Sequence, residues 1–113
     1  WLCWAQVSLG MPLFKYLANT SDYTPADQRS ATQAEAALKD THAMLRILDA
    51  RIGERGNVVH DRWTLADADL FAVLGWGLYM GKIDTADYRH LGAWIARGNE
   101  RPAHRKLMAE AGC

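Results

Sequence analysis

The sequence predicts an all-α fold, an orthogonal or up-down bundle of about five helices. Apolar residues recur at intervals of three and four along most of the chain, which is the period of an amphipathic helix. No stretch alternates apolar and polar residues with a period of two, so no β-sheet is expected. The 113 residues, 50% of them apolar, suffice for one domain with its own core.

The first helix is expected at the start of the chain, and it carries two partly apolar stripes, which imply two neighbours. One stripe contains Leu2, Gln6, Leu9, Leu13, Tyr16 and Leu17. The other contains Trp1, Trp4, Ser8, Met11 and Lys15. Because Pro12 lacks an amide donor and clashes with the carbonyl four residues back, we expect a kink between Ser8 and Pro12.

A long second helix is expected from Pro25 to Ile52. Thr24 can cap it, Pro25 suits the first helical position, and Asp27 stands where a reciprocal carboxylate belongs. Gly53 would end it. At 1.5 Å per residue it would be about 42 Å long, more than the roughly 34 Å diameter of a compact domain of this size. The helix therefore either overhangs the bundle and leans on a partner, or bends.

The clearest local motif, a capping box, begins the third helix. Thr64 can accept a hydrogen bond from the backbone three residues on, while Asp67 reaches back to the amide of Thr64. The helix that follows is apolar nearly all round, so we expect it to be the buried centre of the bundle. Gly75 and Gly77 either admit a close neighbour or ligand, or loosen the C-terminal half of the helix.

Two short helices are expected to close the chain. Asp84 or Thr85 caps the first, which bears Leu91, Trp94 and Ile95 and stops at Gly98-Asn99. Pro102 opens the second, with Leu107 and Met108 facing inward.

Charge and composition exclude several classes of partner. The 13 basic and 13 acidic residues give a formal net charge of zero, so neither nucleic acid nor an anionic membrane is an expected partner. No apolar run reaches the roughly 20 residues needed to span a bilayer, and no secretory signal opens the chain. Cys3 and Cys113 form no disulfide framework, which favours a cytoplasmic protein with inert thiols. Since the first residue is Trp1, we expect a trimmed chain or a fragment.

Few residues are candidates for chemistry. The four histidines, at positions 42, 60, 90 and 104, show no metal-ligand spacing, so no metal site is predicted. Asp67 and Asp69 lie on different faces of their helix and cannot act as a carboxylate pair. We expect no catalytic residue. The stripe of Trp1, Trp4, Ser8 and Met11 would face a substrate cleft, a second subunit or another domain.

Several motifs together resemble the all-helical C-terminal domain of the glutathione transferase superfamily, over essentially all 113 residues. The most specific is VHDRWTLAD, from Val59 to Asp67, which resembles the capping-box start of the family's central helix. WIAR at 94–97 with RPA at 101–103 resembles its closing helices, and WLCW at 1–4 and AMLRILD at 43–49 its first two. One departure is that Trp63 would pack on Ala68, where the family has a bulky residue.

The resemblance implies that the first and central helices wall an apolar pocket for an electrophilic co-substrate. Trp4, Ser8 and Met11 are the candidate substrate-binding residues, while Thr64 and Asp67 have a structural capping role. Members of the family also carry an N-terminal thioredoxin-like domain of about 80 residues, which binds glutathione and is absent from this sequence. No cofactor is then bound by this chain, glutathione being implied for the full-length member. The expected partners are such a domain in cis or trans and a second copy in a homodimer, and the chain alone should be inactive.

Two alternatives remain open at this point. Domains of this superfamily also serve assembly without catalysis, as in the gamma subunit of a translation elongation complex and in aminoacyl-tRNA synthetase complexes. A free-standing helical bundle that binds small ligands is the other alternative.

Overall fold

A computed structural model describes residues 1–112, and every regular element in that range is helical. The predicted all-α bundle is therefore confirmed. A continuous first helix is followed by four separate ones. The elements are α1 (Leu2–Trp4), a π-helical turn (Ala5–Leu9), α2 (Gly10–Thr20), a 3₁₀ turn (Ala26–Gln28), α3 (Ala31–Arg55), α4 (Leu65–Tyr79), α5 (Arg89–Glu100) and α6 (Pro102–Glu110).

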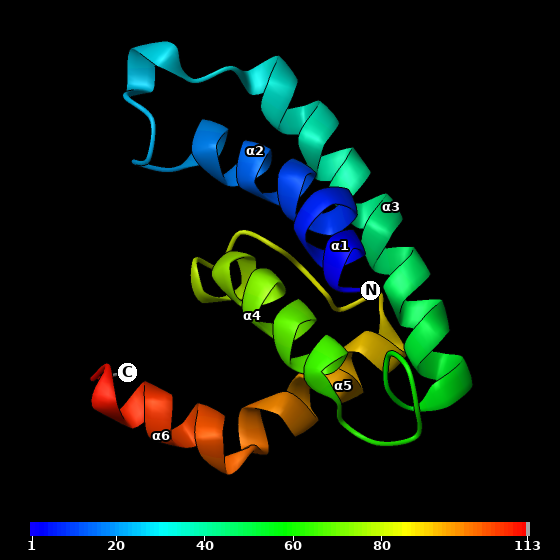
Figure 1. Cartoon of the computed structure of the whole chain (residues 1–113). Coiled ribbons are helices and arrows are strands. Elements are labelled where there is room, and N and C mark those ends of the chain that lie inside the picture. The colour runs from blue at the N-terminus through cyan, green and yellow to red at the C-terminus, as the bar shows by residue number, and fades with distance from the viewer. Residues whose placement is uncertain (113) are drawn as a thin grey trace.

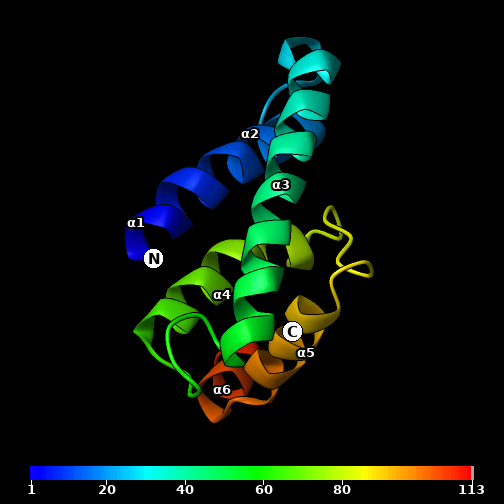
Figure 2. The same ribbon diagram turned by 90° about the vertical axis from the view of Figure 1, so that its right-hand side faces the viewer.

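The bundle is organised around the hairpin of α2 and α3. These two helices pack against each other, and α3 follows one side of the molecule along its whole length (Figures 1 and 2). Helix α4 lies in the middle, with α2 on one side and α6 on the other, while α5 packs against α3 (Figure 1). The 25 residues of α3 span about 37 Å, within the 45 Å long dimension of the molecule. Since α2 accompanies its N-terminal half, α3 does not overhang the bundle alone.

The core lies where α2, α3, α4 and α5 meet. Its largest fully buried side chain is Trp94, and fully buried leucines from four helices belong to the same core. The first predicted stripe is correct from Leu9 onward, whereas Leu2 and Gln6 at its start are exposed. The fully buried leucines are Leu9, Leu13, Leu17, Leu45, Leu48, Leu70, Leu74 and Leu91.

The first helix is irregular close to the predicted place. A π-helical turn spans Ala5–Leu9, and the helix resumes α-helical geometry at Gly10. Pro12 lies in the first turn of α2, where it has no amide to donate to the carbonyl of Ser8. The irregularity thus falls about one turn earlier than expected and takes the form of a widened turn.

The predicted limits of the second helix are wrong at both ends. Helix α3 begins at Ala31, capped by Ser30, whose hydroxyl accepts a hydrogen bond from the amide of Gln33 at 3.2 Å. It continues past Gly53 to Gly56, which has the left-handed φ of 83° that favours glycine at a helix end. Gly53 lies inside the helix and beside the exposed ring of His90, which would have to shift to admit a Cβ at 2.7 Å.

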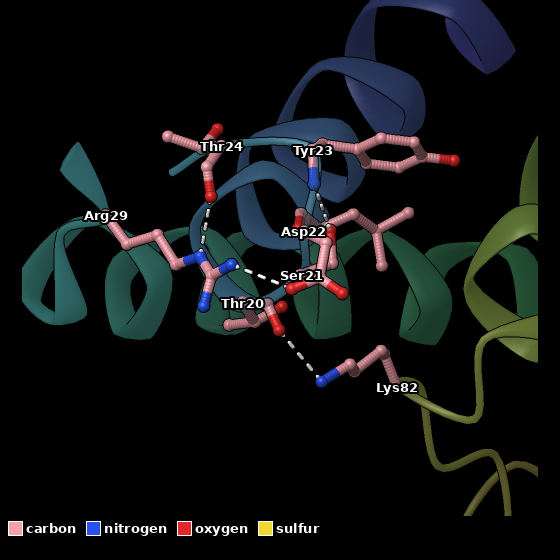
Figure 3. A network of polar contacts seen from close by, with 8 residues as sticks. Thr20, Ser21, Asp22, Tyr23, Thr24, Arg29 and Lys82 are labelled. Atoms are coloured by element: carbon pink, nitrogen blue, oxygen red, sulfur yellow. Dashed lines mark hydrogen bonds and ion pairs between the residues drawn. The ribbon is translucent and has the colours of Figure 1, made fainter. Parts of the chain in front are cut away.

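The segment expected to cap that helix belongs to a polar loop (Figure 3). Arg29 donates to the carbonyl of Thr24 at 2.8 Å and pairs with the carboxylate of Asp22 at 3.0 Å. Lys82, from the segment after α4, donates to the carbonyl of Thr20 at 2.9 Å. These contacts close the turn between α2 and α3 and connect it to the α4–α5 segment.

The closing helices also differ from expectation. Asp84 accepts from the amide of Ala86 at 2.9 Å, but the helix itself begins later, at Arg89. It continues through Gly98 to Glu100, so Gly98 does not end it. Pro102 opens α6 as predicted. Leu107 is 60% exposed, and its predicted inward orientation is wrong.

The helices and the cysteine in the described residues bear on membrane crossing and on thiol chemistry. None of the helices in residues 1–112 combines the length and hydropathy that a membrane crossing requires. Cys3 is a free, exposed thiol, whereas Cys113 lies outside the described residues.

Candidate functional site

The start of α4 is a buried hydrogen-bond centre built on Asp67. In the capping box, Thr64 faces the amide of Asp67, and Asp67 Oδ2 accepts from the amide of Thr64 at 2.9 Å. The same oxygen accepts from the Thr64 hydroxyl at 3.1 Å. Asp67 Oδ1 accepts from the amide of Val58 at 3.0 Å and from Trp94 Nε1 at 2.8 Å. Both oxygens of this buried carboxylate are thus taken up by donors from the backbone, a hydroxyl and an indole of the same chain.

Trp63 packs in an aromatic cluster beside that centre. Its ring stacks on Trp94 at 5.5 Å between centroids and meets Phe71 edge-on at 5.8 Å. Position 68 holds an alanine, so the bulky neighbours of Trp63 are Phe71 and Trp94 instead. The weak contact expected between Trp63 and Ala68 is thus replaced by a contact among three aromatic rings.

One groove lies between α2 and α3 and has a volume of about 600 Å³. Ser8 and Met11 line it together, as two of the three candidate substrate residues. Trp4 is not among the lining residues; it is half-buried and meets Trp1 edge-on at 5.1 Å. The remaining lining residues are Pro12, Lys15, Ala36, Ala37, Asp40, Ala43 and Met44. No histidine lines the groove, so Ser8 has no imidazole base there that would activate it as a nucleophile.

A second groove, of about 730 Å³, lies between α4 and α6 and is far more aromatic. We call it the α4–α6 groove. Its lining residues are Trp63, Ala68, Phe71, Ala72, Gly75, Trp76, Tyr79, Gly98, Arg101, Ala103, His104, Leu107, Met108 and Ala111. The sequence-based expectation of an α4 buried on all sides is wrong here, since Trp76 is 51% and Tyr79 71% exposed. Gly75, one of the two glycines expected to admit a neighbour or ligand, lines this groove, but the other lining residues come from separate segments and have no local sequence signature.

Large apolar side chains remain exposed on the first helix and on its neighbour α4, and we call them together the α2–α4 face. It consists of Val7 and Phe14 on the first helix and Leu65 and Trp76 on α4, all exposed. Gln6 Nε2 donates to Asp69 Oδ1 at 3.2 Å, and this bond holds the two helices side by side at the face. Large apolar side chains exposed on two neighbouring helices make this side of the molecule a candidate interaction surface.

The titratable side chains of residues 1–112 form no metal cluster, and two of them, His42 and Tyr88, lie in contact. In residues 1–112, no group of His, Cys, Asp and Glu has the arrangement of a metal site. His42 Nδ1 lies 2.6 Å from the hydroxyl of Tyr88, which is itself buried. Burial raises the pKa of Tyr88, and the charge of Arg46 offsets part of that effect.

Comparisons with known proteins give one family and one fold. The family described as "Glutathione S-transferase, C-terminal domain" matches residues 11–102. A solved structure of a glutathione transferase from Methylococcus capsulatus strain Bath matches with a TM-score of 0.77 and 25% sequence identity. The match covers 98% of this chain and 53% of that one, so the chain spans about half the length of that transferase. No curated protein matches in sequence.

Proposed function

Because the chain belongs to the family of glutathione S-transferase C-terminal domains, we propose that it is the substrate-side domain of a glutathione transferase. In this role it contributes an apolar wall to the co-substrate pocket and a surface on which a thioredoxin-like domain docks. The reaction is the attack of a glutathione thiolate on an apolar electrophile. The docked domain holds the glutathione and stabilises its thiolate.

The observation that carries this proposal is the exposed α2–α4 face. Phe14, Leu65 and Trp76 are large apolar side chains that a monomeric domain normally buries in part or covers with a partner. The similar transferase has a further half that this chain does not match. A docking domain of that size is the occupant that this face fits.

The proposed substrate wall is the side of the first helix that bears Trp4, Ser8 and Met11. Ser8 and Met11 line the α2–α3 groove, and Trp4 lies one turn before Ser8 on the same side of the helix. Met11 is 67% exposed, and its flexible thioether adapts to apolar molecules of different shape. These residues bind and orient the electrophile, and none of them supplies a proton or a nucleophile.

The test is a fusion protein. The part of the Methylococcus capsulatus transferase that this chain does not match is joined ahead of Trp1, and conjugation of glutathione to 1-chloro-2,4-dinitrobenzene is followed. We expect the fusion to be active and the chain alone to be inactive. Phe14→Glu should abolish the activity of the fusion by breaking the docked face, while Glu54→Gln, on exposed α3 surface, should not.

If the fusion is inactive, hydrogen exchange distinguishes two explanations. If hydrogen exchange shows α2 and α4 protected by the added domain but no conjugation occurs, the chain is a docking module and not a transferase half. If the α2–α4 face stays unprotected, the docking proposal itself is wrong. Members of this family commonly form dimers, and we expect sedimentation of the active fusion to give a homodimer.

A further inference from the structure

One carboxylate lies among the apolar side chains of the α2–α4 face. Leu65, Asp69 and Trp76 are spaced by four and seven residues along α4, so their side chains leave the helix on one side. Leu65 and Trp76 are exposed, and Asp69 between them is half-buried. A surface that covers the two apolar side chains therefore also covers the charge of Asp69.

This carboxylate has few hydrogen-bond partners within the chain. Gln6 Nε2 lies 3.2 Å from Asp69 Oδ1 and 3.4 Å from Oδ2, so the two oxygens share one neutral amide group. Among residues 1–112, Asp69 accepts from no other group, and the ion pairs in that range involve other carboxylates. Because an ionised carboxylate can accept about four hydrogen bonds, water must satisfy most of its capacity while the face is open.

The neighbouring Asp67 shows what a covered carboxylate requires. It is fully buried, and four donors of the same chain converge on its two oxygens. Covering Asp69 removes its water and leaves it a single amide group, which is strongly unfavourable for an anion. A docked surface would have to bring several neutral donors to one point, whereas one ammonium or guanidinium group compensates the charge directly.

This inference rests on the docking role proposed above: we propose that the surface covering the α2–α4 face presents a lysine or arginine side chain to Asp69. Gln6 holds the carboxylate where the first helix and α4 lie side by side, so the cation is received at a fixed point. The apolar side chains supply contact area, and the charge pair fixes the register of the docked surface. A surface without this cation is disfavoured, because it would bury the anion unpaired.

Asp69→Asn in the fusion protein tests the charge, since asparagine keeps an oxygen for Gln6 but is neutral. Docking is measured as hydrogen-exchange protection along α4 in the fusion, divided by the protection in the isolated chain that carries the same substitution. We expect this ratio to fall at least about tenfold, because the opposing cation is left unpaired. Glu54→Gln removes a charge from exposed α3 surface and should leave the ratio unchanged.

The direction of the change separates the possible arrangements at Asp69. A higher ratio in Asp69→Asn would mean that docking buries the carboxylate without a cation, and an unchanged ratio would mean that Asp69 stays in water. Either result overturns the inference but not the docking, because the wild-type fusion still protects α4. If the wild-type fusion gives no protection, both the docking and the cation are refuted.

Salt distinguishes a cation from a group of neutral donors. Raising the sodium chloride concentration from about 0.1 M to about 1 M shortens the range of charge–charge interactions. We expect the protection ratio of the wild-type fusion to fall several-fold over this range and that of Asp69→Asn to change much less. Equal salt dependence of the two fusions would show that neutral donors satisfy Asp69, and the proposed cation would be wrong.

Discussion

At the scale of single residues, Asp67 has more hydrogen-bond donors around it than any other side chain described above. Four neutral donors converge on its two oxygens, and two of them, the amide of Val58 and the indole of Trp94, come from other segments of the chain. A buried carboxylate surrounded only by donors must keep its acceptor character. The residue therefore joins the capping of α4 to the packing of α5.

Asp67→Asn should destabilise the chain by at least about 2 kcal/mol, because the new amide group turns donors toward donors in a buried place. Urea unfolding followed by circular dichroism measures the change. Asp69→Asn is the matched control on the same helix, since its carboxylate is half-buried and, among residues 1–112, accepts from Gln6 alone. A cost for Asp67→Asn no larger than that of the control would show that the convergence on Asp67 adds no stability.

The hydroxyl of the buried Tyr88 contacts His42 Nδ1 at 2.6 Å, and its titration affects stability. Burial raises its pKa above the ordinary 10.0, so the folded chain holds this proton at a pH where the unfolded chain has lost it. The stability contributed by Tyr88 is therefore fully present below about pH 10 and falls as the pH rises from there toward the folded-state pKa.

Tyr88→Phe removes both the hydroxyl and its titration. We expect it to cost about 1 kcal/mol near neutral pH, where the hydroxyl contacts His42 Nδ1 at 2.6 Å. The difference in unfolding free energy between wild type and variant should then become smaller above about pH 10. Urea unfolding of both chains at about pH 8 and about pH 11 gives the comparison. A difference in unfolding free energy that stays constant with pH would contradict a raised pKa of Tyr88 as its cause.

The capping box shows what the sequence can and cannot predict at this scale. Thr64 and Asp67 are three residues apart, and their contact depends only on local helix geometry, so the motif predicts it. The other two donors to Asp67 lie 9 and 27 residues away in sequence. No local rule brings these two donors to that oxygen. Trp94 reaches it through the packing of α5 against α4, and Val58 through the path of the connection between α3 and α4.

At the scale of elements, the errors fall at helix ends that tertiary contacts decide. Thr24 and Pro25 form a plausible helix start, yet Arg29 binds the Thr24 carbonyl and the Asp22 carboxylate and holds the chain in a loop (Figure 3). Ser30 then takes the cap. Glycines mislead for a related reason. Gly53 and Gly98 look like helix ends, but they are interior positions beside a ring from another helix.

Two glycines of α5, Gly98 and Gly92, differ in the space around them, and this difference predicts opposite effects of an added methyl group. Gly98→Ala should destabilise the chain by about 1–3 kcal/mol, because its Cβ would displace the ring of Phe71. Gly92→Ala, in the same helix and with no atom within 4 Å, should stabilise it by up to about 1 kcal/mol through helix propensity alone. Thermal melts of the two variants give the test. Stabilisation by both would mean that Phe71 moves aside freely and that the aromatic cluster of Trp63, Phe71 and Trp94 is not rigid.

At the scale of the whole molecule, the sequence predicts the fold class but not the grooves. Helical period and caps follow from neighbouring residues, so the all-α bundle is predictable. The two grooves depend on how far apart packed helices lie, and that distance is set by contacts such as Phe71 against Gly98. The stripe of Ser8 and Met11 identifies part of one groove, since both residues lie on one side of one helix. The α4–α6 groove draws on α4, α5 and α6 and has no such local signature.

The last prediction concerns catalysis by the chain on its own. The oxygens of Asp67 are occupied by donors of the same chain, and no histidine in the described residues lines the groove of Ser8, so we expect neither residue to act as a nucleophile or a base. An apolar wall by itself raises the local concentration of the electrophile but does nothing to ionise a thiol. We therefore expect the rate at which glutathione reacts with 1-chloro-2,4-dinitrobenzene to be the same with and without the isolated chain. An initial rate that grows in proportion to chain concentration and saturates with glutathione would show that this half carries thiolate chemistry of its own, and it would overturn the division of labour proposed above.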